Sequence, residues 1–360
     1  MPLLPQLQAH ARVLRRSADS VQIGLVDGAG IVVSGLHADE IEQLTRLARR
    51  ARAPRARSDI PGLQEPDPAA ASGADLGVGR GDGQRTYPAG ERAEAADGTF
   101  VDSTRLASVL SALREHHLVV EQPTRVSELR AHAPEEILAF APDAAARACA
   151  YGLPDDGYSI MRRRRACRVL VDGAGRLADD IAACLREGGV GVVDSGAMAA
   201  GTVDLALRSG RGASPDLVIL LASGGLPFHV GEPWRSRDIP HLPVVIDGPS
   251  ATVGPLVGGI GPCLRCLDLY RTDRDPLWPA LLTQLVPDRP VPMQPVEAET
   301  GLRALVTGLT ATFAYACLDD HELPVGLASA VCLPSPAVSH YRWRTHPKCQ
   351  ACRERVTMEW

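Results

Sequence analysis

Four cysteines in two C-x-x-C pairs give the clearest chemical signal in this sequence. Cys263 and Cys266 lie in GPCLRC, and Cys349 and Cys352 lie in HPKCQAC. Two residues between thiolates suit tetrahedral zinc, with Zn–S bonds of about 2.3 Å. Two unrelated redox or loop motifs are the alternative. Because four thiolates leave no ligand position open, we expect a structural zinc ion.

The two pairs lie too far apart in the sequence for a local zinc finger. A shared metal would instead fasten the C-terminal end of the chain to its middle. His346 precedes Cys349 and is an alternative ligand, although four cysteines already suffice. The elements that position the cysteines must therefore include both the middle and the end of the chain.

Composition limits the classes of function. The 360 residues carry a formal net charge of −5, which argues against nucleic acid as a partner. The longest apolar stretch, near 305–318, is interrupted and too short for a bilayer, so we expect no membrane partner. No signal-peptide pattern is present, and nine cysteines without such a signal favour reduced thiols. We therefore expect a cytoplasmic location.

Residues 1–122 predict a small winged-helix-like α+β domain. Two short apolar runs, 21–25 and 30–33, flank turn residues and predict an antiparallel hairpin. Two amphipathic helices and a short strand at 118–120 follow. The apolar face of the first helix has Ile41, Leu44, Leu47 and Ala48, and that of the second has Leu106, Val109, Leu110 and Leu113. Between the helices, 51–98 is rich in Ala, Gly, Pro, Asp and Arg, which predicts a disordered insertion.

A linker is predicted at 123–164, where Pro123, Pro134 and Pro142 interrupt the chain. It ends in the four-arginine run 162–165, which could indicate nucleic-acid binding. In an acidic chain, directly before a buried strand, a solvated linker is favoured.

Residues 165–360 predict an α/β domain with a Rossmann-like sheet. An apolar strand at 167–171, a glycine turn with a helix, and a strand at 190–193 form a βαβ unit, which requires parallel strands. Further predicted elements are strands at 217–221 and 242–246, an edge or return strand at 252–257, a core helix at 299–318, and antiparallel strands at 328–333 and 338–344.

The turn after the first strand reads G-x-G-x-x-A, with Gly173 and Gly175. Such a turn lets backbone N–H groups approach a phosphate, and Asp194 after the second strand could bind a ribose. Three carboxylates near the turn argue against an anionic ligand there: Asp172, Asp179 and Asp180. Nucleotide binding and a turn kept for packing both stay open.

The segment GPLVGGIGPCLRCLDLYRTDRDPLWPAL, the βαβ core and the closing HPKCQAC resemble a known family. They look like actinobacterial ThiF-like proteins related to the partners of azole-forming cyclodehydratases, in the superfamily of ThiF, MoeB and ubiquitin-activating enzymes. The resemblance covers about 160–353. It implies a ThiF-type sheet domain with a zinc site. The N-terminal piece is similar to the winged-helix module that recognises leader peptides ahead of such domains.

Active members of that superfamily adenylate their substrates with ATP. Their site uses the glycine turn, the acid after the second strand, nearby arginines and lysines, and a magnesium-associated Asp. Gly173, Gly175 and Asp194 match the first features. The strand 217–221 is followed by Ala-Ser-Gly-Gly with no acid, and the stretch before it holds two arginines and no lysine. Phosphoryl chemistry depends on such cations and metals, so ATP use is not expected here.

We therefore expect a zinc-stabilised, non-catalytic binder of a precursor (leader) peptide in the biosynthesis of ribosomally made, modified peptides. It would serve a cyclodehydratase-type modifying enzyme. The peptide would add as a strand along Ile31, Val32 and Val33, unless this hairpin only packs on its own helices. The alternative is an active adenylyltransferase, or cyclodehydratase component, acting on the C-terminus of a peptide or carrier protein. The resemblance also implies a homodimer.

Overall fold

The computed structural model describes residues 6–8, 11–24, 31–52, 104–122, 124, 129, 133–285 and 295–353. The chain divides into two units, Met1–Tyr158 and Ser159–Trp360. Apart from its first two residues, which end a helix, the predicted insertion 51–98 lies outside the described residues.

The N-terminal unit is built on a three-stranded antiparallel sheet in the order β2-β3-β4. A second strand pair, β1 with β5, is also antiparallel. The elements are β1 (Gln6–Leu7), β2 (Val13–Arg15), β3 (Ser20–Ile23), β4 (Ile31–Ser34), α1 (Ala38–Arg52), α2 (Thr104–Glu115), β5 (Val119–Val120) and α3 (Pro134–Tyr151). The pairing of β3 with β4 confirms the predicted hairpin. Its identity as a winged helix stays a prediction.

One apolar cluster forms the core of this unit. The helical periodicity correctly predicted the apolar faces that enter it, because residues of both helices share this cluster with β3. The side chain of Leu106 lies outside the described residues. Its members include Ile41, Leu44, Leu47 and Ala48 of α1, Val109, Leu110 and Leu113 of α2, and Val21 and Ile23 of β3. Ile31 and Val33 pack against this cluster, whereas Val32 is 49% exposed. Strand β4 therefore buries one face and leaves the other open.

The prediction of a linker at 123–164 is wrong for most of this range, which forms two helices, α3 and α4 (Tyr158–Ala166). Pro134 starts α3 at a position where no backbone donor is needed, so this proline favours the helix. Glu136 accepts a hydrogen bond from the Ala133 N–H at 3.3 Å and caps the helix start. Proline spacing alone could not distinguish this helix start from a linker.

The prediction that the arginine run 162–165 is solvated is wrong for Arg164. Its side chain is fully buried, and its Nε and Nη2 bond to the two carboxylate oxygens of Asp319 at 2.7 and 2.6 Å. Its Nη1 donates to the Gly188 carbonyl at 2.9 Å, and the guanidinium lies over the Tyr315 ring. The bidentate carboxylate satisfies a charge that would otherwise exclude the residue from the core.

The C-terminal unit contains a seven-stranded mixed sheet in the order β12-β11-β10-β9-β8-β6-β7. Its strands are β6 (Arg168–Asp172), β7 (Val192–Ser195), β8 (Leu217–Ser223), β9 (His241–Asp247), β10 (Ser250–Val253), β11 (Leu327–Cys332) and β12 (Val338–Arg342). Strands β7, β6, β8 and β9 are parallel, which confirms the βαβ unit. Of the two predicted alternatives for 252–257, the return strand is confirmed, because β10 pairs antiparallel with β9. The edge position is wrong, because β11 pairs with the other side of β10.

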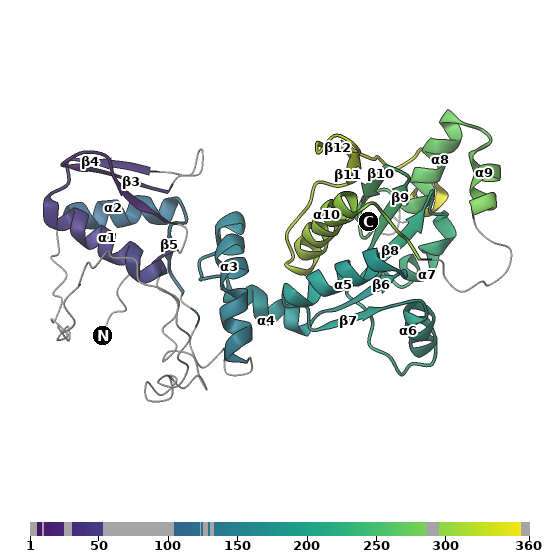
Figure 1. Cartoon of the computed structure of the whole chain (residues 1–360), viewed down its shortest axis with the longest axis horizontal. Coiled ribbons are helices and arrows are strands. Elements are labelled where there is room, and N and C mark those ends of the chain that lie inside the picture. The colour runs from purple at the N-terminus through teal and green to yellow at the C-terminus, as the bar shows by residue number, and fades with distance from the viewer. Residues whose placement is uncertain are drawn as a thin grey trace, which may run out of the picture. The chain divides into compact units, whose positions relative to one another are not determined.

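Helices cover both faces of this sheet (Figure 1). Val169 and Val171 of β6 pack in the cluster with α5 (Arg176–Glu187) and α10 (Thr300–Leu318), whereas Leu170 packs in the cluster of the opposite face. The other helical elements are α6 (Ala199–Arg208), η4 (Phe228–Val230), α7 (Glu232–Arg235), α8 (Leu264–Arg274) and α9 (Trp278–Leu285). The alternation along β6 is that of a strand buried on both sides.

Helix α10 is long and apolar enough to cross a membrane by length and composition, and it is the one such helix among the described residues. In this fold it packs along α5 and buries Leu302, Val306 and Phe313 in the sheet cluster. It is a core helix of the C-terminal unit, as the sequence predicted.

Candidate functional site

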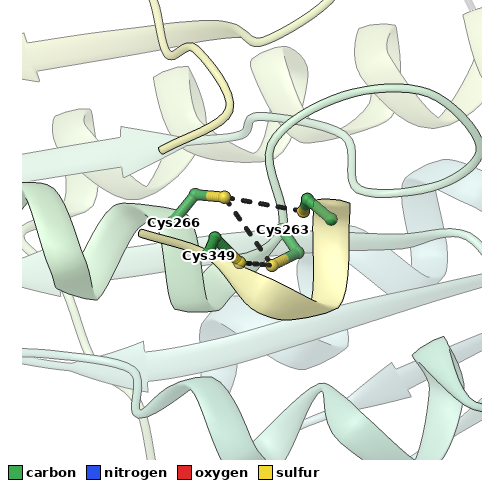
Figure 2. Close-up of side chains that lie close together, drawn as sticks. Cys263, Cys266 and Cys349 are labelled. Carbon is green, nitrogen blue, oxygen red and sulfur yellow. Dashed lines mark hydrogen bonds between the residues drawn. The ribbon is translucent and has the colours of Figure 1, made fainter. Parts of the chain in front are cut away.

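The two cysteine pairs converge in the C-terminal unit. Cys263 and Cys266 lie at the start of α8, and Cys349 lies beside them (Figure 2). Cys349 directly precedes the short helical stretch 350–353, which contains Cys352. Their four Sγ atoms lie within 4.8 Å of one another. The S···S distances are 3.9 Å for 263–266, 3.7 Å for 263–349 and 3.6 Å for 266–352. Zn–S bonds of about 2.3 Å in a tetrahedron require sulfurs about 3.8 Å apart, so the donor set fits zinc.

His346 contacts this cluster through its backbone and does not replace one of the thiolate ligands. Its N–H donates to Cys266 Sγ at 3.3 Å. Its imidazole points away, because Nδ1 accepts from the Lys348 N–H at 3.1 Å and Nε2 lies 2.8 Å from Asp273 Oδ2. With Nδ1 accepting, Nε2 carries the proton and donates to Asp273. The alternative of His346 as a ligand is therefore not supported by this geometry.

Without a metal, the cluster divides its charge unequally among the sulfurs. Hydrogen bonds from the neighbouring thiols, that of Cys266 first, lower the pKa of Cys263. Their hydrogen bonds to Cys263 raise the pKa of Cys266 to about 11 and also raise the pKa of Cys352. Cys263, Cys266 and Cys349 are buried. Four thiolates around one ion leave no coordination position for water or substrate, so the site suits a structural role.

The glycine turn joins β6 to α5, where the sequence predicted it. Gly175 has φ +98°, and a Cβ there would lie 2.8 Å from Glu297 Oε1 and 2.9 Å from Pro295 Cβ. At Gly173 a Cβ would lie 2.7 Å from the Leu221 side chain. Both glycines are thus required by the close approach of the chain itself.

Glu297 lies at the N-terminus of α5, where a phosphate would bind in a nucleotide site. Its Oε1 accepts from the Arg176 backbone N–H at 3.2 Å, and its Oε2 accepts from Arg176 Nε at 2.9 Å. These two hydrogen bonds hold the pKa of Glu297 below its usual range. Because a helix N-terminus attracts anions, Glu297 supplies the negative charge that a ligand would otherwise bring. No local pattern in the sequence linked Glu297 to this turn.

Asp194, the predicted ribose ligand, is engaged by a neighbouring strand. Its Oδ2 lies 2.7 Å from Arg168 Nε, and this hydrogen bond raises the pKa of Arg168. Asp194 lines a cavity of about 510 Å³ together with Met198 and Thr202 of the α6 region. Neither Gly173 nor Gly175 lines that cavity. The cavity that Asp194 lines therefore does not include the two glycines of the turn.

The carboxyl ends of the parallel strands, where such folds bind ligands, are occupied by the chain's own groups. Burial raises the pKa of Asp172, the last residue of β6, to about 6. After β8, a Cβ at Gly225 would lie 3.0 Å from Leu282 and 3.2 Å from Leu285 of α9. Helix α9 thus packs closely on the loop after β8, in which 224–227 contain no acid.

The predicted peptide edge is β4, with Ile31, Val32 and Val33. Among the described residues β4 pairs with β3 alone, so its outer edge is not paired within this sheet. Ile31 and Val33 pack against the core, and Val32 is exposed. The strand could therefore both pack on its helices and accept an added strand.

Comparison with known proteins supports the fold. No protein-family model matches the sequence, and no curated protein resembles it closely enough to count as a match. Among solved structures, E. coli MccB matches with a TM-score of 0.54 at 12% identity, covering 97% of this chain and 99% of MccB. MccB has been solved with ATP and, as the microcin C7 biosynthetic enzyme, with N-formylated MccA.

A heterocyclase solved in complex with substrate and cofactor also matches, with a TM-score of 0.55 at 14% identity. The match covers 97% of this chain but 39% of the heterocyclase. At such identities a likeness shows the fold alone. The chain has the ThiF-like fold that its cysteine-flanking segment predicted, the fold it shares with MccB and with part of a heterocyclase.

Proposed function

We propose that this protein binds a precursor peptide and serves a peptide-modifying enzyme of the cyclodehydratase type, without adenylating a substrate itself. The observation that carries the proposal is Glu297 at the N-terminus of α5. Its carboxylate bonds to both the backbone and the guanidinium of Arg176. A nucleotide phosphate would have to displace it and would also lie near the carboxyl group of Asp172 at the end of β6.

The catalytic groups of an adenylating enzyme lack counterparts around this turn. Arg176, the cation nearest to it in sequence, is paired with Glu297. Asp194 is paired with Arg168, and the loop after β8 contains no acid that could hold magnesium. Adenylation needs cations and a metal to stabilise charge on the phosphates. We therefore prefer a binding role over the adenylyltransferase alternative.

Peptide binding is supported by two observations. The structures with this fold include MccB in complex with MccA and a heterocyclase in complex with its substrate. Strand β4 offers an edge with exposed Val32, and added strands gain affinity from main-chain hydrogen bonds. In this proposal the peptide adds along Ile31–Val33, in a winged-helix-like unit.

We also propose that two copies of the chain form a homodimer. Light scattering would then give twice the mass of one chain.

The cysteine cluster would hold zinc as a structural ion. It joins α8 to the segment after β12, which are far apart in the sequence. When bound, zinc would supply folding energy, since its four ligands leave no position for chemistry.

A peptide titration tests the binding role with the full chain. Labelled leader-like peptides encoded near the gene should bind, and Val32→Asp should weaken binding about tenfold because it places a desolvated charge at the pairing edge. Leu14→Asp is the matched control, since Leu14 is 39% exposed on β2, the opposite edge of the same sheet. Equal losses in both variants, or no binding by any peptide, would count against the proposal.

Exchange of pyrophosphate into ATP tests the absence of adenylation. We expect no exchange by the protein, with or without added peptide. Exchange that is present in the wild type and abolished by Asp194→Ala would instead establish the adenylyltransferase alternative.

A further inference from the structure

A basic pocket lies between α8 and the end of β12 in the C-terminal unit. Its volume is about 640 Å³, and its lining includes Arg271 and Arg274 of α8 with Tyr341, Arg342, Trp343 and Arg344 of the β12 end. We refer to this group of six residues as the arginine pocket. It is distinct from the cysteine cluster, the glycine turn and the β4 edge.

The arginine pocket has a large excess of positive charge in an acidic chain. Among the described residues its ion pair joins Arg271 Nη1 to Asp268 Oδ1, at 3.6 Å. In the described ranges no carboxylate lies within ion-pair distance of Arg274, Arg342 or Arg344. Four guanidinium groups with one carboxylate contact form a site for a ligand that carries several negative charges.

Aromatic rings hold two of these guanidinium groups in place. Arg271 and Arg274 lie 5.8 and 5.7 Å from the centroid of the Trp343 ring. Arg271 also lies 5.1 Å from the Trp278 ring. Such contacts restrict the side chains, which reduces the entropy lost when an anion binds. Arg274 Nε donates to the Tyr270 carbonyl at 3.4 Å, so the terminal nitrogens of Arg274 are the donors that would face a ligand.

The pocket adjoins an open strand edge. Strand β12 ends the seven-stranded sheet and pairs with β11 alone among the described residues. The Trp343 N–H donates to the Gly326 carbonyl at 2.8 Å. Because hydrogen-bonding direction alternates along an antiparallel strand, the backbone groups of His340 and Arg342 face the outer edge. An added strand there would run directly into the arginine pocket.

We propose that the β12 edge and the arginine pocket together bind an extended acidic segment of a partner polypeptide. Main-chain hydrogen bonds to β12 would set its register, and its Asp or Glu side chains would pair with the four arginines. A second β12 edge is not the occupant, because β12 (VSHYR) carries no carboxylate that could pair with the arginines. A nucleotide would satisfy the charge but would leave the strand edge unused. This site adds to the proposed β4 site and does not depend on it.

Fluorescence anisotropy of the full zinc-loaded chain tests the proposal with a labelled peptide of alternating glutamate and threonine. We expect binding that weakens with salt and falls about tenfold or more in Arg274→Glu and in Arg344→Glu. Arg211→Glu is the matched control, because it makes the same charge change at an exposed loop after α6. A peptide with glutamine for glutamate should bind about tenfold more weakly. A peptide N-methylated at alternate residues should show the same loss, because it cannot pair with β12.

Several results would overturn the proposal. If the glutamine peptide binds as tightly as the glutamate peptide, charge pairing with the arginines is not part of the interaction. If the N-methylated peptide binds as tightly, strand pairing with β12 is not part of it. Competition by ATP at concentrations that match the peptide affinity would identify a phosphate ligand. The C-terminal residues 354–360 include Glu354 and Glu359, so the chain's own end could compete for the arginines. If a variant truncated after Arg353 binds the peptide about tenfold more tightly, the chain's own end is the occupant. The Val32→Asp variant separates the two proposed sites. It should lose binding of the leader peptide and still bind the glutamate–threonine peptide.

Discussion

Glu297 accepts hydrogen bonds from both the backbone N–H and the Nε of Arg176, at 3.2 and 2.9 Å. The pair joins the start of α5 to the segment that leads into α10. It also gives the glycine turn a role, because Gly175 lets the chain at Pro295 and Glu297 approach the turn within contact distance. A turn with the sequence of a phosphate loop is thereby used to bind a carboxylate of its own chain.

The first prediction concerns the charge of Glu297. Its pKa in the folded protein lies below the ordinary 4.5, so the carboxylate stabilises the fold above pH 4.5 and loses this effect as the pH falls through the lowered pKa. Glu297→Gln should therefore lower the melting temperature at pH 7 and have little effect near pH 3. Glu322→Gln, at an exposed position, is the control. A pH-independent difference would show that the ion pair with Arg176 contributes nothing.

The second prediction concerns the cysteine cluster. Purified protein should contain about one zinc per chain by mass spectrometry. Cys349→Ser should lose the metal and lower the melting temperature strongly, because metal binding and folding are coupled. Cys332→Ser, which changes an exposed cysteine outside the cluster, should retain both metal and stability. Metal-free wild type, or a Cys349→Ser variant that keeps its zinc, would contradict a four-cysteine site.

The sequence predicted the elements whose patterns are local. Apolar periodicity identified the buried faces of α1 and α2, and the run from Leu217 to Leu221 identified β8. The spacing of the cysteines predicted a cluster that the fold brings together across the chain. Each helix face, strand or C-x-x-C pair is a pattern within a short stretch of sequence, so periodicity or ligand spacing is enough to detect it.

The features that sequence reasoning missed depend on pairing between distant segments. Glu297 has no pattern that links it to Arg176, and Asp319 has none that links it to Arg164. An arginine run near prolines is typical of a solvated linker, and only the tertiary partner makes burial of one member favourable. The interior position of β10 likewise follows from β11, which comes much later in the chain.

The third prediction concerns the buried pair of Arg164 and Asp319. Removing one partner leaves the other charge buried without compensation, so Asp319→Ala should lower the free energy of unfolding by about 3–5 kcal/mol. Asp320→Asn is the neighbouring control, because asparagine tolerates the left-handed backbone found there (φ 60°). Urea unfolding measures both. The double change Arg164→Met with Asp319→Leu should cost less than Asp319→Ala, and a larger cost would mean that the pair is itself a strong net stabiliser.

The fourth prediction concerns Asp172 at the end of β6. Burial raises its pKa from the ordinary 3.8 to about 6, so the folded state binds this proton more tightly than the unfolded state does. The carboxylate therefore destabilises the fold progressively as the pH rises from 4 to 6, and fully above that range. Asp172→Asn should raise the free energy of unfolding by about 2–3 kcal/mol at pH 8 and change it little at pH 4. Urea unfolding at both pH values measures the difference, with Asp247→Asn at an exposed strand end as the control. A variant that is less stable at pH 8 would show that the ionised carboxylate has a favourable partner, such as a bound cation, and would reopen the case for a metal-assisted site at this turn.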